Sequence, residues 1–160
     1  MSVNEQEFKN ALKLWASGVT VVTSKSADGG LKGMTATSFS SVSIDPPQIL
    51  VCINKSADTG DAVLESKTFA INVLKAEQQA ISNEFAGGAS QEERFANVNW
   101  HKSDLGSPII DDALASLECT VVDQVSAGSH WVVIGEVQNV DCRSGEPLLY
   151  YNSGYRELMT

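Results

Sequence analysis

The chain has 160 residues, of which 42% are hydrophobic and 19% charged, and its formal net charge is −9. This length fits a single domain over residues 1–160, and the composition carries no signature of disorder. A surface this acidic argues against nucleic acid or an anionic membrane as a partner, although a local cradle of backbone N–H groups can still bind a small anion.

The cysteines and histidines favour neither disulfides nor a metal site. Cys52, Cys119 and Cys142 are widely spaced and form no Cys-x-x-Cys pair, which is typical of thiols in a reducing compartment. His101 and His130 are far apart in the sequence, and their spacing resembles no zinc or iron site. We therefore predict no bound metal.

The N-terminal residues carry neither the basic segment nor the apolar segment of a signal peptide. Apolar runs along the chain stay well below the roughly 18 residues that a membrane span needs. We expect a soluble protein in the cytoplasm.

The first third of the chain predicts one helix followed by strands. Apolar residues at helical spacing over 5–16 indicate a short amphipathic helix that covers part of the core and stops near Gly18. The β-branched run over 19–24 predicts a strand. A turn signal over 27–30 then predicts a hairpin whose return strand spans 31–37.

The rest of the chain also favours strands. The return strand is expected to continue through 39–44 until Pro46 and Pro47 break it. The continuous apolar run over 48–54 predicts a strand buried on both faces. The remaining expected elements are a helix over 58–66 with Asp58 or Thr59 as N-cap, a strand over 68–74, a helix over 77–86 ended by Gly87 and Gly88, a helical turn and polar loop within 89–112, long strands over 117–125 and 129–141, and a short strand over 148–151.

About eight strands and three short helices result from these patterns, and hairpin-like connections dominate. They favour a mainly β fold, an antiparallel barrel with short helices at its openings. The first strand is not followed by G-x-G-x-x-G, which argues against a Rossmann dinucleotide site. A G-x-S-x-G elbow for a hydrolase is also absent from the sequence.

Three stretches carry residues suited to ligand chemistry. Residues 33–43 surround the small Ala36 with hydroxyls, which suit a flavin's ring edge, ribityl chain and phosphate, or form only a polar strand edge. Residues 54–59 lead into a helix whose N-terminal N–H groups, with Ser56, Thr59 and the charge of Lys55, suit a phosphate. The same residues are also ordinary helix caps.

The third stretch, residues 128–131, opens a strand that alternates His130 with apolar neighbours. Both faces of this strand are apolar, so it is expected to lie between the core and another layer, such as a second subunit. His130 either contacts a ligand or is a structural histidine.

Taken together, the sequence resembles the flavin reductase-like family with the FMN-binding split-barrel (Greek-key) fold, and in particular the short reductase components of two-component flavin-dependent monooxygenases. The resemblance runs from Phe8 to Leu158. Its landmarks are Gly18–Thr23, Gly33–Phe39, Ser43–Pro47, Phe69–Leu74, Arg94–Phe95, Leu117–Cys119, Gly128-x-His130, Ile134–Val137 and Pro147–Tyr151.

This resemblance implies a flavin site made of specific residues. They are Thr35, Ala36, Thr37 and Ser38 for the ribityl chain and phosphate, Val51, Cys52 and Ile53 along the ring edge, Ser56 and Thr59 for the phosphate, and Phe85 and Ala86 nearby. His130 and Tyr155 match positions that flank the nicotinamide. Relatives often carry Asp where this chain has Ser129, which leaves the orientation of His130 open.

The implied activity is that of an NAD(P)H:flavin oxidoreductase, a homodimer in which hydride passes from NADH or NADPH to FMN or FAD. Reduced flavin would then be supplied to a partner monooxygenase. Alternatives are a reductase that keeps its flavin and reduces other acceptors such as ferric complexes, a non-catalytic flavin-binding or storage protein, and pyridoxine-phosphate oxidase-like chemistry on a related barrel. The Gly128-x-His130 and Tyr155 pairing favours a reductase over a storage protein.

Overall fold

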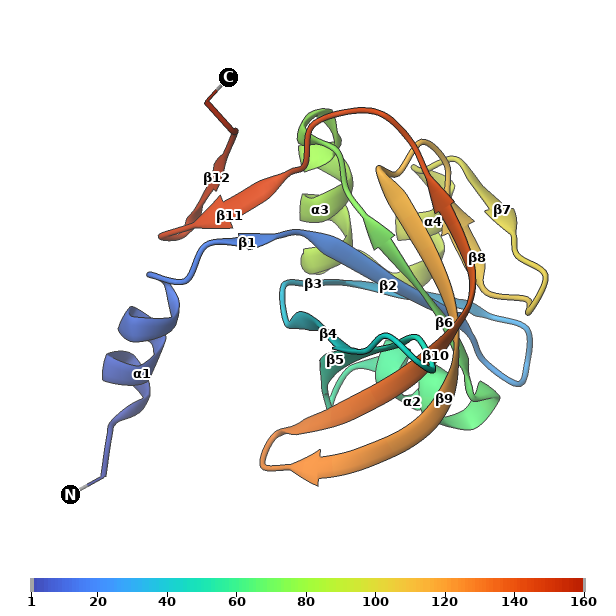
Figure 1. Ribbon diagram of the computed structural model, residues 1–160, viewed down its shortest axis with the longest axis horizontal. Helices are drawn as coiled ribbons and strands as arrows, with labels where there is room; N and C mark the ends of the chain where they lie inside the picture. Colours follow the sequence, from blue (N-terminus) through green and yellow to red (C-terminus); the bar gives the residue numbers. More distant parts are fainter. Residues whose placement is uncertain (1, 160) are drawn as a thin grey trace.

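The computed structural model describes residues 2–159, and its centre is a seven-stranded sheet in the order β3-β2-β6-β9-β10-β5-β4. Every neighbouring pair in this sheet is antiparallel. The sheet curls round on itself (Figure 1). Its strands are β2 (Thr20–Lys25), β3 (Leu31–Ala36), β4 (Phe39–Ser43), β5 (Gln48–Asn54), β6 (Thr68–Val73), β9 (Ala115–Ala127) and β10 (His130–Cys142). The predicted mainly β antiparallel barrel is confirmed.

Apolar side chains fill the barrel. One cluster inside it includes Val22, Val51 and Phe69, and a second cluster between the sheet and the helices includes Val21 and Phe85. Successive residues of a strand point to opposite faces, so Val21 and Val22 of β2 serve the two clusters in turn. A ligand must therefore bind outside the barrel.

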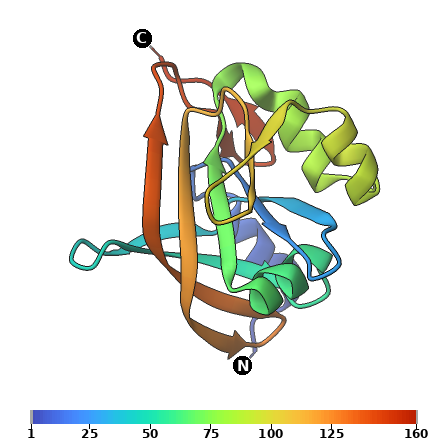
Figure 2. The same cartoon turned by 90° about the vertical axis from the view of Figure 1, so that its right-hand side faces the viewer.

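The helices pack around the sheet (Figure 2). The ring of Phe85 packs directly against the backbone of β3 at Gly33. It can do so because glycine has no Cβ, and a Cβ there would lie 2.6 Å from a ring carbon of Phe85. The helices packed around the sheet are α2 (Asp58–Ser66), the 3₁₀ helix η1 (Ala76–Gln78), α3 (Gln79–Ala86) and α4 (Gln91–Ala96).

The first helix, α1 (Glu5–Leu12), is shorter than predicted and covers none of the core. Asn4 and Glu7 form its capping box, yet within the described chain none of its residues is buried. Phe8 is 57% exposed and Trp15, just beyond the helix, is 78% exposed. The prediction that this helix covers the core is wrong, because α1 lies away from the barrel (Figure 1). The short strand β1 (Ser17–Gly18), which pairs with β11 (Leu149–Tyr151), connects it to the rest of the chain.

Two expectations about strands are also wrong. Burial in β5 alternates, so Val51 and Ile53 are buried while Leu50 and Cys52 are only partly covered, and the strand is not buried on both faces. The 39–44 segment does not continue β3. β3 ends at Ala36, and the segment forms β4, which pairs with β5 at the opposite end of the strand order.

The structure contains further strands that the sequence patterns did not predict. The supposed polar loop after α4 forms the hairpin of β7 (Trp100–Lys102) and β8 (Pro108–Ile110), and β12 (Gly154–Arg156) follows β11. Residues 2–159 thus form twelve strands rather than about eight. Among the described helices, none has the length and apolar character needed to span a membrane.

The three cysteines predict a clear order of reactivity. Cys142 is exposed, Cys52 is partly covered and Cys119 is buried. Burial, with a smaller contribution from the Glu118 carboxylate, raises the pKa of the Cys119 thiol to about 12. At about pH 8, iodoacetamide should alkylate Cys142 first and leave Cys119 unmodified in the folded protein, because the thiolate is the reactive form. Mass spectrometry of the peptides measures this order, and early labelling of Cys119 would contradict the packing.

Candidate functional site

A groove on the outside of the barrel consists of three cavities in a row. The α2 cavity (about 380 Å³) lies at the start of α2, the α3 cavity (about 380 Å³) lies beside α3, and the α1 cavity (about 590 Å³) lies between α1 and the outer face of β4 and β5. Thr35 and Ala86 line both of the first two cavities, and Thr37 and Ser153 line both of the last two. The shared residues make the row suitable for one elongated ligand.

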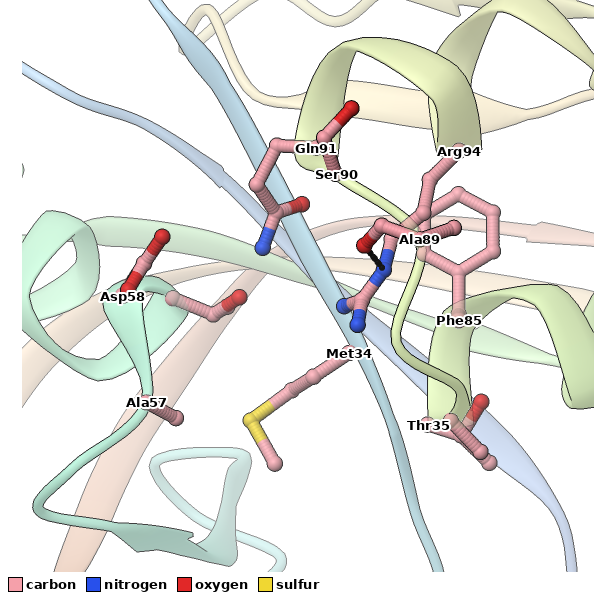
Figure 3. Close-up of a pocket in the computed structure, with 11 residues that line it drawn as sticks. Met34, Thr35, Ala57, Asp58, Phe85, Ala89, Ser90, Gln91 and Arg94 are labelled. Carbon is pink, nitrogen blue, oxygen red and sulfur yellow. Dashed lines mark hydrogen bonds between the residues drawn. The ribbon is translucent and has the colours of Figure 1, made fainter.

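The α2 cavity is built from three parts of the chain. Figure 3 shows Ala57 and Asp58 from the start of α2 on one side and Phe85 and Arg94 from α3 and α4 on the other, with Met34 of β3 between them. Gln91 of α4 lies above Met34 in this view.

The start of α2 offers unused hydrogen-bond donors to this cavity. The N-cap is Ala57, so the prediction of Asp58 or Thr59 as N-cap is wrong, and no side chain within residues 2–159 caps the helix. The first N–H groups of a helix lack partners inside the helix and carry a partial positive charge. Thr59 is fully buried, and its hydroxyl has no hydrogen-bond partner in the described part of the chain. A phosphate fits these donors.

Arg94 adds positive charge on the opposite wall. Its guanidinium donates to the carbonyl oxygens of Gly33 (2.7 Å), Gly87 (2.6 Å) and Ala89 (3.1 Å). These three bonds fix the loop between α3 and α4 against β3. A guanidinium has more N–H donors than these bonds use, so some remain for an anion.

Asp58 partly opposes this charge. It lines the α2 cavity and is largely exposed, and Lys32 Nζ lies 3.8 Å from its Oδ2. An exposed ion pair of this kind contributes about 0–1 kcal/mol. The lysine therefore offsets the carboxylate without fixing it.

The middle and far parts of the groove are hydroxylic and then apolar. In the α3 cavity, Thr35 donates its hydroxyl to Ser82 O (2.7 Å), while the Tyr155 hydroxyl shares a hydrogen bond with Ser82 Oγ (2.7 Å) and donates to Asn83 Oδ1 (2.8 Å). In the α1 cavity, Cys52 presents its side chain with the apolar Phe39, Leu50, Leu12 and Trp15. This end suits a flat apolar ring.

Seven of the predicted flavin contacts line the groove: Thr35, Thr37, Ser38, Cys52, Thr59, Phe85 and Ala86. The side chains of Ala36, Val51 and Ile53 instead point into the barrel core. Lys55 donates to Ser126 and lies over the Trp131 ring, and Ser56 bonds Asn54, so neither side chain is directed at the groove.

The two predicted nicotinamide contacts lie apart. Tyr155 lines the α3 cavity, whereas His130 lines none of the three groove cavities. His130 pairs with Asn54 and Val132 pairs with Cys52, so His130 shares the outer sheet face with Cys52. Ser129 Oγ lies 2.8 Å from His130 Nδ1, and this hydrogen bond fixes the orientation of the ring.

Residue patterns missed part of the site. In the sequence Arg94 is only a landmark of the resemblance, and no pattern singles out Gln91. The sequence Ser90-x-x-Glu93 forms a capping box that starts α4, and this signal could have placed Arg94 on a helix next to the loop.

A cradle for phosphate, a hydroxylic middle and an apolar end match the parts of a flavin nucleotide in order. The buried Thr59 hydroxyl, unpartnered among residues 2–159, adds a hydrogen-bond donor to the α2 cavity. The fold and the groove together suit a flavin nucleotide on the outside of a split antiparallel barrel.

The chain belongs to the family described as flavin reductase like domain, whose model matches residues 12–159. It is 39% identical to the FMN reductase (NADH) RutF of Pseudomonas syringae pv. syringae over 98% of this chain and 88% of that protein. It is also 39% identical to the reductase component of the flavin-dependent trigonelline monooxygenase of Acinetobacter baylyi, over 94% of this chain but only 48% of that protein.

A solved structure has the same fold. It is the NADH:FAD oxidoreductase SgcE6 of Streptomyces globisporus C-1027 in complex with NAD and FAD fragments, which is 30% identical with a TM-score of 0.90 over 99% of this chain and 97% of that one. The predicted family is confirmed.

Thr59→Val tests the phosphate cradle. Removing a buried, unpartnered hydroxyl should raise the free energy of unfolding of the ligand-free protein by about 1 kcal/mol. The same change should weaken FMN about tenfold, because a hydrogen bond to a charged group is lost. Riboflavin, which has no phosphate, should bind as before.

Ser107→Ala is the matched control. The Ser107 hydroxyl is also buried and has no partner among residues 2–159, but it lies outside the groove cavities. Thermal unfolding and flavin fluorescence titrations measure both effects. Equal loss of FMN and riboflavin binding in Thr59→Val would contradict the assignment.

Proposed function

We propose that this chain is an NADH:flavin oxidoreductase that reduces FMN or FAD and releases the reduced flavin to a separate monooxygenase component. The observation that carries the proposal is the Thr59 hydroxyl, unpartnered among residues 2–159, at the uncapped start of α2, facing Arg94 across one cavity. Membership of the flavin reductase family supports the activity, and the RutF relative is an FMN reductase that uses NADH. The trigonelline relative is the reductase component of a flavin-dependent monooxygenase, which supports a partner of that kind.

The chain's own residues would bind and orient the reactants. The flavin supplies the hydride-accepting ring, so no side chain is needed as a nucleophile. Thr59 and the start of α2 would hold the phosphate, Thr35 and Thr37 would contact the ribityl chain, and Cys52 would lie beside the ring. An open groove of this kind lets reduced flavin leave.

His130 would contact the nicotinamide from the outer sheet face. The hydrogen bond between Ser129 Oγ and Nδ1 leaves Nε2 as the nitrogen presented to a ligand. Tyr155 lines the α3 cavity apart from His130, and its hydroxyl is tied to α3 through Ser82 and Asn83, so within one chain it would not meet the nicotinamide beside His130. NADPH remains the alternative donor, and comparing both donors in the same assay decides between them.

A homodimer would cover the apolar surfaces that a single chain leaves open. Phe8 and Leu12 of α1 and Val122 and Val125 of β9 are all about half exposed. Burial of such surface favours association by about 25 cal/mol per Å².

The cytoplasmic location predicted from the sequence stays a prediction.

Steady-state turnover tests the activity. Purified protein mixed with NADH and FMN or FAD should oxidise NADH at a rate that scales with protein and saturates with flavin. His130→Ala should lower kcat at least about tenfold while the dissociation constant of FMN changes less than about twofold, because the ring would act on the hydride donor.

His101→Ala is the control, since that histidine is bound to Asp111 on the β7–β8 hairpin. Flavin binding without turnover by the wild-type protein would instead favour a flavin-storage protein. Turnover only with tightly retained flavin and an added ferric complex would favour the other reductase class.

Sedimentation equilibrium tests the dimer. Phe8→Asp should raise the dimer dissociation constant at least about 100-fold, because two copies of the side chain lose their burial. Gln6→Asp, which places the same charge on an already exposed polar position of α1, should have little effect. A monomeric wild-type protein at micromolar concentration would contradict the dimer.

A further inference from the structure

A fourth cavity continues the groove beyond the phosphate end. This α4 cavity has a volume of about 520 Å³, within the roughly 300–1,000 Å³ typical of ligand pockets. Its lining comes from β3 and the turn before it, from α4 and from β7, and consists of Gly30, Leu31, Lys32, Gln91, Glu92, Phe95, Ala96 and Trp100. The proposed binding of FMN leaves this cavity unused.

Two contacts place the α4 cavity next to the α2 cavity. Gln91 lines both, and its Oε1 accepts a hydrogen bond from Gly33 N (2.9 Å), which fixes the side chain at their boundary. Lys32 lines the α4 cavity and lies 3.8 Å from Asp58, which lines the α2 cavity. A ligand that extends past the phosphate at Thr59 would therefore enter the α4 cavity.

The α4 cavity offers an aromatic surface held in place by the core. Trp100 is 37% exposed, and its ring packs edge to face on Phe95 with centroids 6.2 Å apart. Phe95 packs in the same way on the buried Phe85, 5.2 Å away. This chain of rings fixes Trp100 while leaving part of it open to a planar base. Bases stack well on such side chains.

Charge in the cavity fits a second phosphate near its entrance. Lys32 is the less exposed member of its ion pair and lies at the boundary with the α2 cavity. Glu92 also lines the α4 cavity, but it is exposed on the first turn of α4, where water solvates it. Lys32 at the entrance and the Trp100 ring beyond it are therefore placed to contact a pyrophosphate and then an adenosine.

We propose that the α4 cavity is an adenylate subsite that receives the AMP half of FAD. The proposal rests on the proposed function, because it needs the flavin phosphate in the α2 cavity. Both FMN and FAD then use the same groove, and the α4 cavity sets how strongly the protein prefers the dinucleotide. Trp100 is the residue that determines this preference, and Lys32 assists it.

The ratio of FAD to FMN affinity tests the subsite. In fluorescence titrations, Trp100→Ala should lower this ratio about tenfold, and Trp100→Phe, which keeps a stacking ring, should restore most of it. Trp15→Ala is the matched control. Trp15 lines the α1 cavity at the ring end, so its loss should weaken both flavins alike and leave the ratio unchanged. An unchanged ratio in Trp100→Ala would overturn the proposal.

A second measurement needs no variant. In calorimetric titrations of the wild-type protein, 5′-AMP should compete with FAD but bind alongside FMN, and 5′-AMP that competes with neither flavin would overturn the subsite. If Trp100→Ala raises the KM for NADH with FMN as acceptor, the cavity belongs to the nicotinamide dinucleotide and the proposal also fails. Failure of the wild type to bind any flavin would instead refute the proposed function itself.

Discussion

The packing of Phe85 against Gly33 positions α3 and α4 on the outside of the barrel. Without a side chain at Gly33, α3 comes close enough for Phe85 to reach the second core cluster and for Phe95 to pack on it. Arg94 then ties the α3–α4 loop to β3 through the carbonyl oxygen of Gly33. The wall that faces the start of α2 exists only because these contacts hold, and so does the cavity between them.

The buried Thr59 hydroxyl in that cavity is unfavourable in the ligand-free chain, which indicates that it binds a ligand. A buried hydroxyl without a partner costs about 1–3 kcal/mol, and Thr59 has none within residues 2–159. The helix start beside it lacks a side-chain cap in the same region. Stability is therefore lower at the point where a phosphate would bind, and a bound flavin nucleotide would satisfy both sets of donors at once.

Local patterns predicted the elements well where one signal dominated. The strand over 48–54 and the helix over 58–66 have the predicted bounds in the structure. The apolar run of β5 does not reveal which side chains face the core, and the side chains of Val51 and Ile53, predicted along the flavin ring, lie in the core. The pattern of α1 showed that a face needs covering but not what covers it. Arg94 and Thr59 line the same cavity only because of tertiary packing, and their spacing in the sequence does not predict this.

The central claim is that the groove orients a flavin nucleotide with its phosphate at α2 and its ring near α1. A crystal structure of the protein with FMN tests this most directly. We expect phosphate oxygens within hydrogen-bond distance of Thr59 Oγ1 and the first N–H groups of α2, and the ring beside Cys52. A phosphate outside the α2 cavity, or a ring inside it, would contradict the account.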